Sequence, residues 1–205
     1  PPPLVVLYED DLLVALDKPA GVAVHPTGRR QGGTLVHGLL DRYRGEIERC
    51  LRAGDTAFYP GIVNRLDLYT SGVVLFGKRR EATARMHRLI GSGRVRKRYV
   101  ALVLGRLEGE EGEIDLPLGR DDASGIRLKR SVRPDGRPSL TRWRVVERLR
   151  GHTLVEVEPV TGRQHQIRVH FAAVGHPVWG DLLYRDEDLF RRYLASGCRL
   201  VPGLP

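Results

Sequence analysis

The sequence predicts an α+β protein built around a mixed or antiparallel sheet, and three observations support this. Short apolar runs typical of strands outnumber the amphipathic segments typical of helices. Several of these runs follow one another directly, as at 4–7 and 12–16 and again at 140–149 and 153–157. The chain shows no regular alternation of strand and helix, the pattern that would indicate a parallel sheet.

The N-terminal part opens with prolines at 1–3, which we expect to form an extended lead-in. The acidic residues 9–11 separate two apolar runs and predict a hairpin, and the turn residues at 18–21 end its second strand. Thr34 is typical of a helix N-cap. The residues that follow it on one helical face are Leu35, Leu39, Leu40 and Tyr43. Residues 44–60 lack a clear pattern, so we predict a loop containing at most one helical turn.

The middle of the chain alternates between strand and helix signals. Val73 to Phe76 is an apolar run that predicts a buried strand, and residues 81–90 place apolar side chains with helical spacing. Residues 98–104 predict another strand. Residues 115–138 are rich in glycine, proline and charge, and we expect an irregular excursion on the substrate side.

Two helices are expected near the C-terminus. Thr161 and Gln164 have the spacing of a capping box, which predicts a helix over 161–174. Residues 186–195 form a second amphipathic pattern. Because the whole chain has 205 residues and no long linker, we expect a single domain over 1–205.

The charge distribution indicates a polyanionic partner. The formal net charge is +9, and residues 78–98 hold nine Lys or Arg residues against one acid, Glu81. A merely soluble basic protein would not need its Lys and Arg residues clustered in one segment, whereas clustered cations suit phosphate groups. No apolar run has membrane-spanning length, and no export signal is visible. Cys50 and Cys198 fit a reducing cytoplasm, although a disulfide between them stays an open alternative.

One carboxylate suits a catalytic role. Asp67 lies between Leu66 and a Thr-Ser-Gly corner at 70–72, just before the buried strand at 73–76. A lone acid beside a tight corner, at the edge of a strand, is well placed for a positioned catalytic group. The alternative is an aspartate that only caps a turn, because aspartate is favoured there for local hydrogen bonds.

Four stretches resemble the RluA-type RNA pseudouridine synthases. They are YEDDLLVALDKPAGVAVHP at 8–26, RLDLYTSG at 65–72, KRYVALVLG at 97–105 and EPVTGRQHQIRVHFAAVGHPVWGD at 158–181. The likeness covers about residues 4 to 185, and it implies the family's fold, with an active-site cleft across a mostly antiparallel central sheet. Asn64 departs from it, because the family usually has His there, and we give Asn64 no catalytic role.

The resemblance implies a catalytic set of Asp67, Tyr99 and Arg168. Asp67 would act at the sugar, and Arg168, whose guanidinium is always charged, would keep it ionised. Tyr99 would stack on the uracil and act as general acid or base. Without the motifs, the simplest interpretation of Arg168 is a surface arginine on a helix, and that of Tyr99 is a core residue with its hydroxyl at the surface.

The resemblance also implies a substrate-binding surface. Arg65 would fill the space left by a flipped uridine, and Ile167 would form part of the uracil pocket. The other residues we place on this surface are Leu66, Thr70, Ser71, Gly72, Arg163, His165 and Gln166. We expect no cofactor, because the reaction is an isomerisation. We expect no metal site, because His165 and His170 lie five residues apart and cannot share one ion on a helix.

The leading hypothesis is an enzyme that isomerises specific uridines in ribosomal or transfer RNA to pseudouridine. An RNA-binding protein that has lost catalysis on the same fold is the second, and an unrelated basic RNA-binding module is the third. We expect a cytoplasmic monomer with RNA as its partner, no small-molecule cofactor and no membrane association. We also expect no RNA-binding domain ahead of the catalytic one, since the likeness starts near residue 4.

Overall fold

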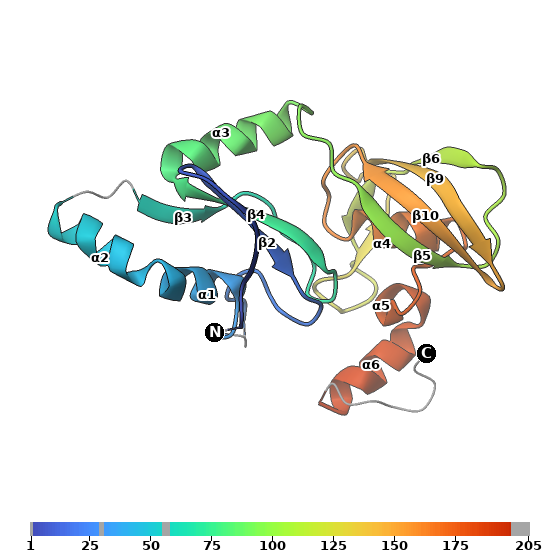
Figure 1. Ribbon diagram of the computed structural model, residues 1–205. Coiled ribbons are helices and arrows are strands. Elements are labelled where there is room, and N and C mark those ends of the chain that lie inside the picture. The colour runs from blue at the N-terminus through green and yellow to red at the C-terminus, as the bar shows by residue number, and fades with distance from the viewer. Residues whose placement is uncertain (1, 29–30, 55–57, 198–205) are drawn as a thin grey trace. The chain divides into compact units, whose positions relative to one another are not determined.

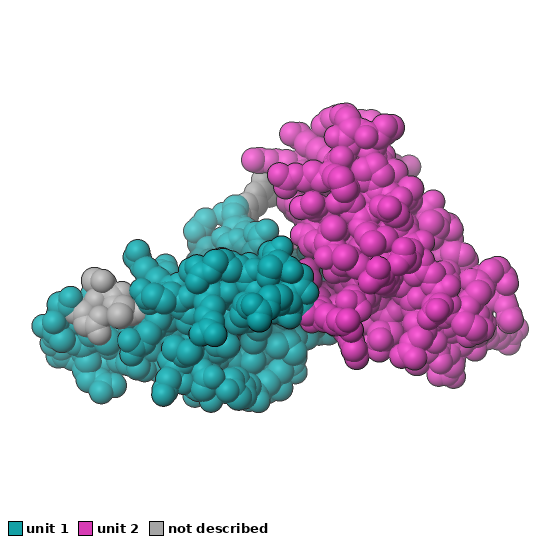
Figure 2. All heavy atoms as spheres, turned by 90° about the horizontal axis from the view of Figure 1, so that it is seen from above, with its two compact units in different colours: residues 1–95 teal, residues 96–205 magenta. Residues whose placement is uncertain are grey.

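The computed structural model describes residues 2–28, 31–54 and 58–197. The chain divides into two compact units, residues 1–95 and 96–205, which Figure 2 colours separately. Each unit has its own sheet and its own hydrophobic core. The α+β class and the antiparallel pairing are confirmed, with the strands shared out between the units.

The first unit holds four strands and three helices within the described residues. In chain order they are β1 (Val5–Glu9), β2 (Leu13–Lys18), α1 (Leu35–Arg42), α2 (Arg44–Arg52), β3 (Phe58–Ile62), β4 (Gly72–Arg79) and α3 (Arg80–Gly91). The strands pair antiparallel in the order β1-β2-β4-β3. The predicted hairpin is confirmed, and the carboxylate of Asp10 accepts hydrogen bonds from the backbone of Leu12 and Leu13 at its turn.

The core of this unit lies between the sheet and α1. Alternate residues of β2 and β4 point into it, among them Leu16 and Phe76, and both are fully buried. Thr34 caps α1 as predicted, accepting a hydrogen bond from the backbone of His37. Of the predicted helical face, only Leu40 remains exposed, at 41%. Figure 1 shows α3 across the other face of the sheet.

Helix α3 lies close to the sheet because two glycines face it. A Cβ atom added to Gly61 or Gly77 would come within 3.0 Å of the Thr83 side chain. Any larger residue at either strand position would therefore push α3 away from the sheet. Helix α3, which carries several cationic side chains, is thus packed directly against the backbone of β3 and β4.

Residues 44–60 differ from the prediction. They hold the helix α2 and the start of β3, where we expected a loop with one turn. Helix α2 buries no residue fully, and Ile47 is its one partly buried residue packed against the core cluster of the unit. Strand β3 contains Pro60, which argues against a central strand. The strand lies at the sheet edge, and its pairing is irregular between Phe58 and Gly61, where a proline is tolerated.

The second unit holds six strands and three helices within the described residues. They are β5 (Tyr99–Leu104), β6 (Glu111–Asp115), β7 (Leu118–Arg120), β8 (Arg130–Val132), β9 (Leu140–Leu149), β10 (His152–Pro159), α4 (Gln166–Ala173), α5 (Leu182–Arg185) and α6 (Glu187–Ala195). One antiparallel sheet has the order β5-β10-β9-β6, and β7 and β8 form a separate ladder. Phe171 of α4 is buried in the core beneath the larger sheet, with Val155 and Val157 of β10.

Four features of this unit differ from the prediction, and the first is strand β6, which was not foreseen. The excursion at 115–138 contains the β7–β8 ladder, and the short helix α5 was not foreseen. Helix α4 begins at Gln166 and not near Thr161, so the predicted capping box is wrong. The Thr161 hydroxyl instead accepts a hydrogen bond from the backbone of Leu140 and donates one to Gln166, which ties residues 161–165 to β9 as a loop.

Candidate active site

Asp67 lies in the loop between β3 and β4, in the first unit, and is partly buried. The loop folds back at once, because the backbone carbonyl of Asp67 accepts a hydrogen bond from the Thr70 N–H at 3.1 Å. Gly72 then begins β4 with φ +125°, a conformation that favours glycine. The turn is closed by the main chain of Asp67, so closing it does not require the carboxylate.

Asn64 fastens the start of the same loop to β4. Its side-chain oxygen accepts a hydrogen bond from the Leu75 N–H at 2.8 Å, and its amide donates to the Val73 carbonyl at 3.1 Å. The Asn64 side chain thereby makes two hydrogen bonds to β4 of the kind that the backbone of a neighbouring strand would make. The residue that departs from the family pattern therefore has a structural task, which agrees with giving it no catalytic role.

The far side of the loop is held by the turn that follows β2. The Leu68 carbonyl accepts hydrogen bonds from the Gly21 N–H at 2.9 Å and from the ammonium of Lys18 at 3.0 Å. No sequence pattern connects positions 18 and 68. Residue 68 directly follows Asp67, so the backbone that carries the carboxylate is fixed from two directions.

The predicted substrate-binding residues of the first unit line this loop in different ways. Arg65 and Ser71 are exposed and can reach a ligand. Leu66 packs against the hydrophobic core, where it supports the loop from below. Thr70 and Gly72 shape the turn through their backbones.

Arg168 is the third residue of α4, in the second unit. Its guanidinium makes two bonds to Asp181, with Nε 2.5 Å from Oδ2 and Nη2 2.9 Å from Oδ1. Such paired bonds fix both the position and the plane of the guanidinium. The Asp181 side chain is only 5% exposed, and it also accepts a hydrogen bond from the Tyr184 N–H at the start of α5. Arg168 is therefore a partly exposed helix residue whose side chain is held in place by Asp181, and its catalytic role stays a prediction.

Tyr99 and Ile167 both pack against the core of the second unit. Tyr99 begins β5, opposite Val157 of β10, and its side chain is partly buried. Ile167 is partly buried beside the same core cluster. The partial burial of both side chains agrees equally well with the predicted roles at the uracil ring and with a role in the core.

His165 has the most unusual backbone in the part of the chain that the structure describes. It is the one non-glycine residue there with positive φ, at 57°, and it caps the start of α4. Its ring Nδ1 lies 2.7 Å from the Tyr184 hydroxyl, which in turn accepts the Arg130 N–H. Residues held in this conformation gather at functional sites, which supports the predicted role of His165.

Gln166 is turned into the protein. It is 3% exposed, and its amide donates to the Leu140 carbonyl and the Thr141 hydroxyl at 2.9 Å each. Its oxygen accepts hydrogen bonds from the Thr161 hydroxyl and the Arg163 N–H. Because both ends of the amide are engaged inside the fold, we assign Gln166 to shaping the loop and not to direct substrate contact.

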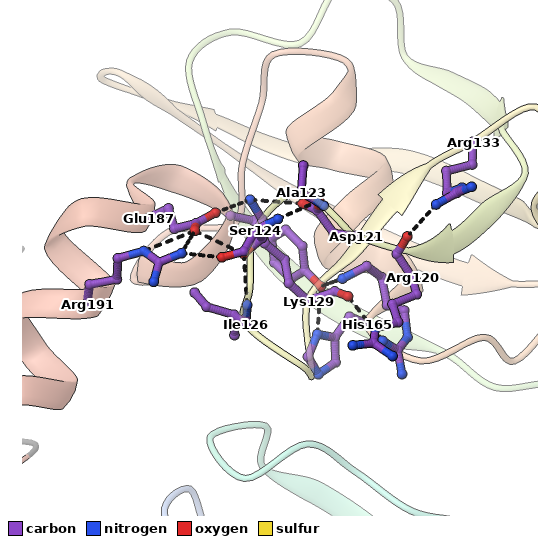
Figure 3. Close-up of polar contacts among 12 residues, drawn as sticks. Arg120, Asp121, Ala123, Ser124, Ile126, Lys129, Arg133, His165, Glu187 and Arg191 are labelled. Carbon is purple, nitrogen blue, oxygen red and sulfur yellow. Dashed lines mark hydrogen bonds and ion pairs between the residues drawn. The ribbon is translucent and has the colours of Figure 1, made fainter.

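The segment 121–130 is fastened to α6 by an ionic network, which Figure 3 shows. Glu187 contacts Lys129 at 2.5 Å, the Ser124 hydroxyl at 2.9 Å and Arg191 at 2.5 Å. Asp121 adds a second carboxylate 3.2 Å from Lys129. The Lys129 ammonium is the main reason that the pKa of Glu187 is lowered to about 2. The segment 121–130 is thus braced against α6.

The predicted catalytic set is divided between the two units. Asp67 belongs to the first, and Tyr99 and Arg168 belong to the second. The meeting of the three groups in one cleft therefore stays a prediction. No set of three or more His, Cys, Asp or Glu residues among 2–28, 31–54 and 58–197 is arranged to hold a metal ion. In the same residues, no helix has the length and apolar character to cross a membrane. Cys50 is a free thiol, and Cys198 lies outside the described residues.

Comparison with known families agrees with these features. The family model described as RNA pseudouridylate synthase matches residues 12–173, a segment that includes Asp67, Tyr99 and Arg168. The chain therefore belongs to the RNA pseudouridylate synthase family.

Particular relatives support the assignment. The ribosomal large subunit pseudouridine synthases D of Nitrosomonas europaea and Xanthomonas campestris pv. campestris are 40% and 42% identical to this chain over 182 residues. Each match covers 89% of this chain and 50% or 52% of the relative, so the chain spans about half the length of these curated relatives. The solved structure of human RNA pseudouridylate synthase domain containing 1 has a TM-score of 0.74 at 26% identity, covering 91% of this chain and 71% of that one.

Proposed function

We propose that this chain isomerises uridine to pseudouridine within structured RNA. The observation that carries the proposal is that Asp67, Tyr99 and Arg168 all fall inside the segment that matches the family. Two of them also have dedicated supports: the backbone beside Asp67 is pinned at Leu68, and Arg168 is paired with Asp181. A chain that had lost catalysis would have little reason to retain both.

The reaction exchanges one bond to the sugar for another. The N1–C1′ bond of the uridine breaks, the uracil turns, and a C5–C1′ bond forms. The proton leaves C5 and a proton ends on N1, so atoms and electrons balance without a cofactor. Positive character develops at C1′ as the base leaves, and a carboxylate at Asp67 suits this. Two routes are open to the Asp67 carboxylate: it adds to C1′, or it removes the 2′ proton.

The other groups act on the base and on the carboxylate. Tyr99 would stack on the uracil and exchange a proton with it. Arg168 would pair with Asp67 and keep it charged while Asp181 holds the guanidinium plane. Arg65, exposed beside Asp67, would occupy the space that the extruded uridine leaves. Extrusion costs a few kcal/mol, and phosphate contacts from the basic segment 78–98 would offset this.

The substrate we favour is large-subunit ribosomal RNA. The support is the names of the relatives, three of which are ribosomal large subunit pseudouridine synthases D from different bacteria. Transfer RNA is the second candidate. We propose that the chain acts as a monomer in the cytoplasm, where both RNAs are accessible.

The second candidate function is an RNA-binding protein without activity. The departure at Asn64 is the only feature that favours it. The Asn64 side chain makes two hydrogen bonds to β4. This structural task accounts for asparagine at position 64, so the departure does not require that catalysis was lost.

The test is tritium release from RNA labelled at C5 of uridine. We expect the chain to release tritium from large-subunit ribosomal RNA, and Asp67→Asn to release none above background. Asp17→Asn is the matched control, since Asp17 is an exposed carboxylate of the same unit, on β2. It should keep activity within about twofold, as surface substitutions generally do. Release that persists in Asp67→Asn, or its absence on both ribosomal and transfer RNA, would overturn the proposal.

A further inference from the structure

An open groove, which we call the β3–α3 groove, lies between the edge strand β3 and the helix α3 of the first unit (Figure 1). Tyr59 and Gly61 line it from β3, because alternate residues of a strand share one face. The helix contributes residues with the i, i+3, i+4, i+7 spacing of one helical face, namely Arg80, Thr83, Ala84 and His87. The groove has a volume of about 360 Å³. Ligand pockets measure roughly 300–1,000 Å³, so this groove has room for a planar group such as a nucleobase.

Close packing fixes the two walls of the β3–α3 groove. A Cβ atom added to Gly61 would collide with the Thr83 side chain, so the strand backbone itself meets the helix there. The His87 ring joins the same two elements, with Nε2 3.0 Å from the Ile62 carbonyl oxygen. A ligand that enters a preformed groove does not have to order it first, and this favours binding.

Tyr59 presents an exposed aromatic ring to the groove. Tyr59 is 58% exposed, and the Arg80 Cζ atom lies 5.9 Å from the ring centroid, within the range of a cation–π contact. Arg80 is itself exposed and makes no ion pair among the residues that the structure describes. Proteins bind single-stranded nucleic acid with this combination, in which a base stacks on the ring and a phosphate contacts the cation.

Further arginines on α3 also lack a counter-charge. Arg85 and Arg88 are exposed and have no carboxylate partner in the described part of the chain. Arg80 and Arg88 are eight positions apart, roughly 12 Å along the helix axis, so together they can contact two phosphates of one strand. In the second unit, by contrast, the exposed Arg120 and Arg142 are paired with carboxylates. Charge complementarity therefore favours a polyanion as the occupant of the groove.

We propose that the β3–α3 groove holds an unpaired nucleotide of the RNA substrate, with its base stacked on Tyr59 and its flanking phosphates on Arg80 and Arg88. The proposal rests on the proposed function for the identity of the substrate. Strand β3 leads directly into the loop that carries Asp67. Gly61 and Asp67 are six positions apart, and an extended chain of that length spans at most about 21 Å. The groove therefore lies close enough to Asp67 to bind the same RNA strand.

This site would select single-stranded RNA beside the target uridine. Bases inside a paired duplex stay stacked on one another, whereas those of loops and bulges can turn out onto an aromatic side chain. Stacking tolerates every base, because each base has a flat face. The groove would therefore distinguish unpaired from paired RNA and not one sequence from another.

The first test measures binding to two strands of equal length and charge. One is a short oligocytidylate, which has no uridine for the proposed reaction, and the other is an abasic strand, which has no base to stack. Tyr59→Ala should weaken binding of the oligocytidylate about tenfold, the scale of one lost stacked base, and change binding of the abasic strand by no more than about twofold. Tyr59→Phe, which keeps the ring, should bind both strands as wild type does. Tyr8→Ala is the matched control, because Tyr8 is 55% exposed on the edge strand β1 of the same unit.

The second test measures the salt dependence of binding. Arg80→Ala should weaken binding of both strands and reduce the slope of log K against log salt by about 0.7, the value for one phosphate contact on a single strand. Arg52→Ala is the control for the lost charge, since the Arg52 side chain is 75% exposed on α2. It should leave the slope unchanged. Equal slopes for Arg80→Ala and wild type would refute the phosphate contact.

Wild-type binding of the oligocytidylate by Tyr59→Ala, or an equal loss in Tyr8→Ala, would refute the stacking site. An equal loss on both strands in Tyr59→Ala would also refute it, because Tyr59 would then act on the fold and not on a base. If Tyr59→Ala does not fold, Tyr59→Leu takes its place with the same expectations. Failure of the proposed function is seen separately, as persistent tritium release by Asp67→Asn, which these binding measurements do not involve.

Discussion

The two units hold their predicted catalytic groups in different ways. In the first unit, the supports act on the backbone around Asp67, through the Leu68 carbonyl and through Asn64. In the second unit, the support acts on the Arg168 side chain itself, through paired bonds to Asp181. A loop residue needs its main chain fixed first, whereas a helix already fixes the main chain and leaves only the rotamer to be set. The kind of element thus decides the kind of support.

The largest expected effect comes from breaking the side-chain support. Asp181→Asn removes the charge that pairs with Arg168 and should lower kcat by about 10- to 100-fold by misplacing the guanidinium. It should also destabilise the protein by about 3 kcal/mol, because it leaves a partly buried charge without its partner. Tritium release and urea unfolding measure the two effects.

Asp188→Asn is the matched control for this variant. Asp188 is an exposed carboxylate in the first turn of α6, in the same unit. Its replacement should change stability by no more than about 0.5 kcal/mol. Equal kinetics for Asp181→Asn and Asp188→Asn would mean that the helix alone positions Arg168.

A smaller effect is expected from weakening the backbone support. Asn64→Ala deletes both bonds to β4, and should cost about 1–2 kcal/mol in urea unfolding. Activity should fall less than in Asp181→Asn, since the bonds from Lys18 and Gly21 to Leu68 remain. Gln31→Ala is the control, because its amide makes only an exposed bond to the Gly28 carbonyl. If Asn64→Ala loses as much activity as Asp181→Asn, the bonds to the Leu68 carbonyl are not enough to hold the loop.

The smallest effect is a pH dependence shared by both units. Glu9 in the first unit and Glu187 in the second each have a pKa of about 2, chiefly through hydrogen bonds from Lys78 and Lys129 respectively. Because these folded-state pKa values lie below the ordinary value of 4.5, each carboxylate makes its full contribution to the free energy of unfolding above pH 4.5. The contribution is then lost as the pH falls towards 2.

Urea midpoints at pH 7, 4 and 3 measure this loss. Glu9→Gln and Glu187→Gln should each lower the midpoint at pH 7 and flatten its fall on acidification. Glu48→Gln is the control, because Glu48 is 57% exposed and lies 3.8 Å from Arg52. A curve for either test variant that runs parallel to wild type down to pH 3 would contradict the assigned role of that carboxylate.

Local sequence signals predicted the elements that depend on their own residues. Thr34 identified the start of α1, and the acidic turn at 9–11 identified the first hairpin. Strands β9 and β10 were visible because their apolar residues alternate. Helix α2 was missed because little of it packs against the core, and β3 because Pro60 is unusual in a strand.

Asp67 and Arg168 were singled out from motifs that stand on their own, and their catalytic roles stay a prediction. The supports of the candidate site were not predictable where a side chain acts on a distant backbone. Lys18 was interpreted as part of a turn, and nothing near it in sequence indicates its bond to Leu68. Gln166 was assigned to the substrate because its motif is family-like, whereas its amide is buried against Leu140 and Thr141. Long-range polar contacts of this kind leave no periodic trace in a sequence.

The Leu68 oxygen has a consequence for mutagenesis. Every residue type supplies the same main-chain acceptor, so alanine scanning would not detect the contribution of position 68. An ester in place of the amide that links Leu68 to Tyr69 makes that oxygen a poorer acceptor while leaving both side chains intact. Chemical synthesis or ligation that introduces this single-atom change would reveal a dependence that no codon change can.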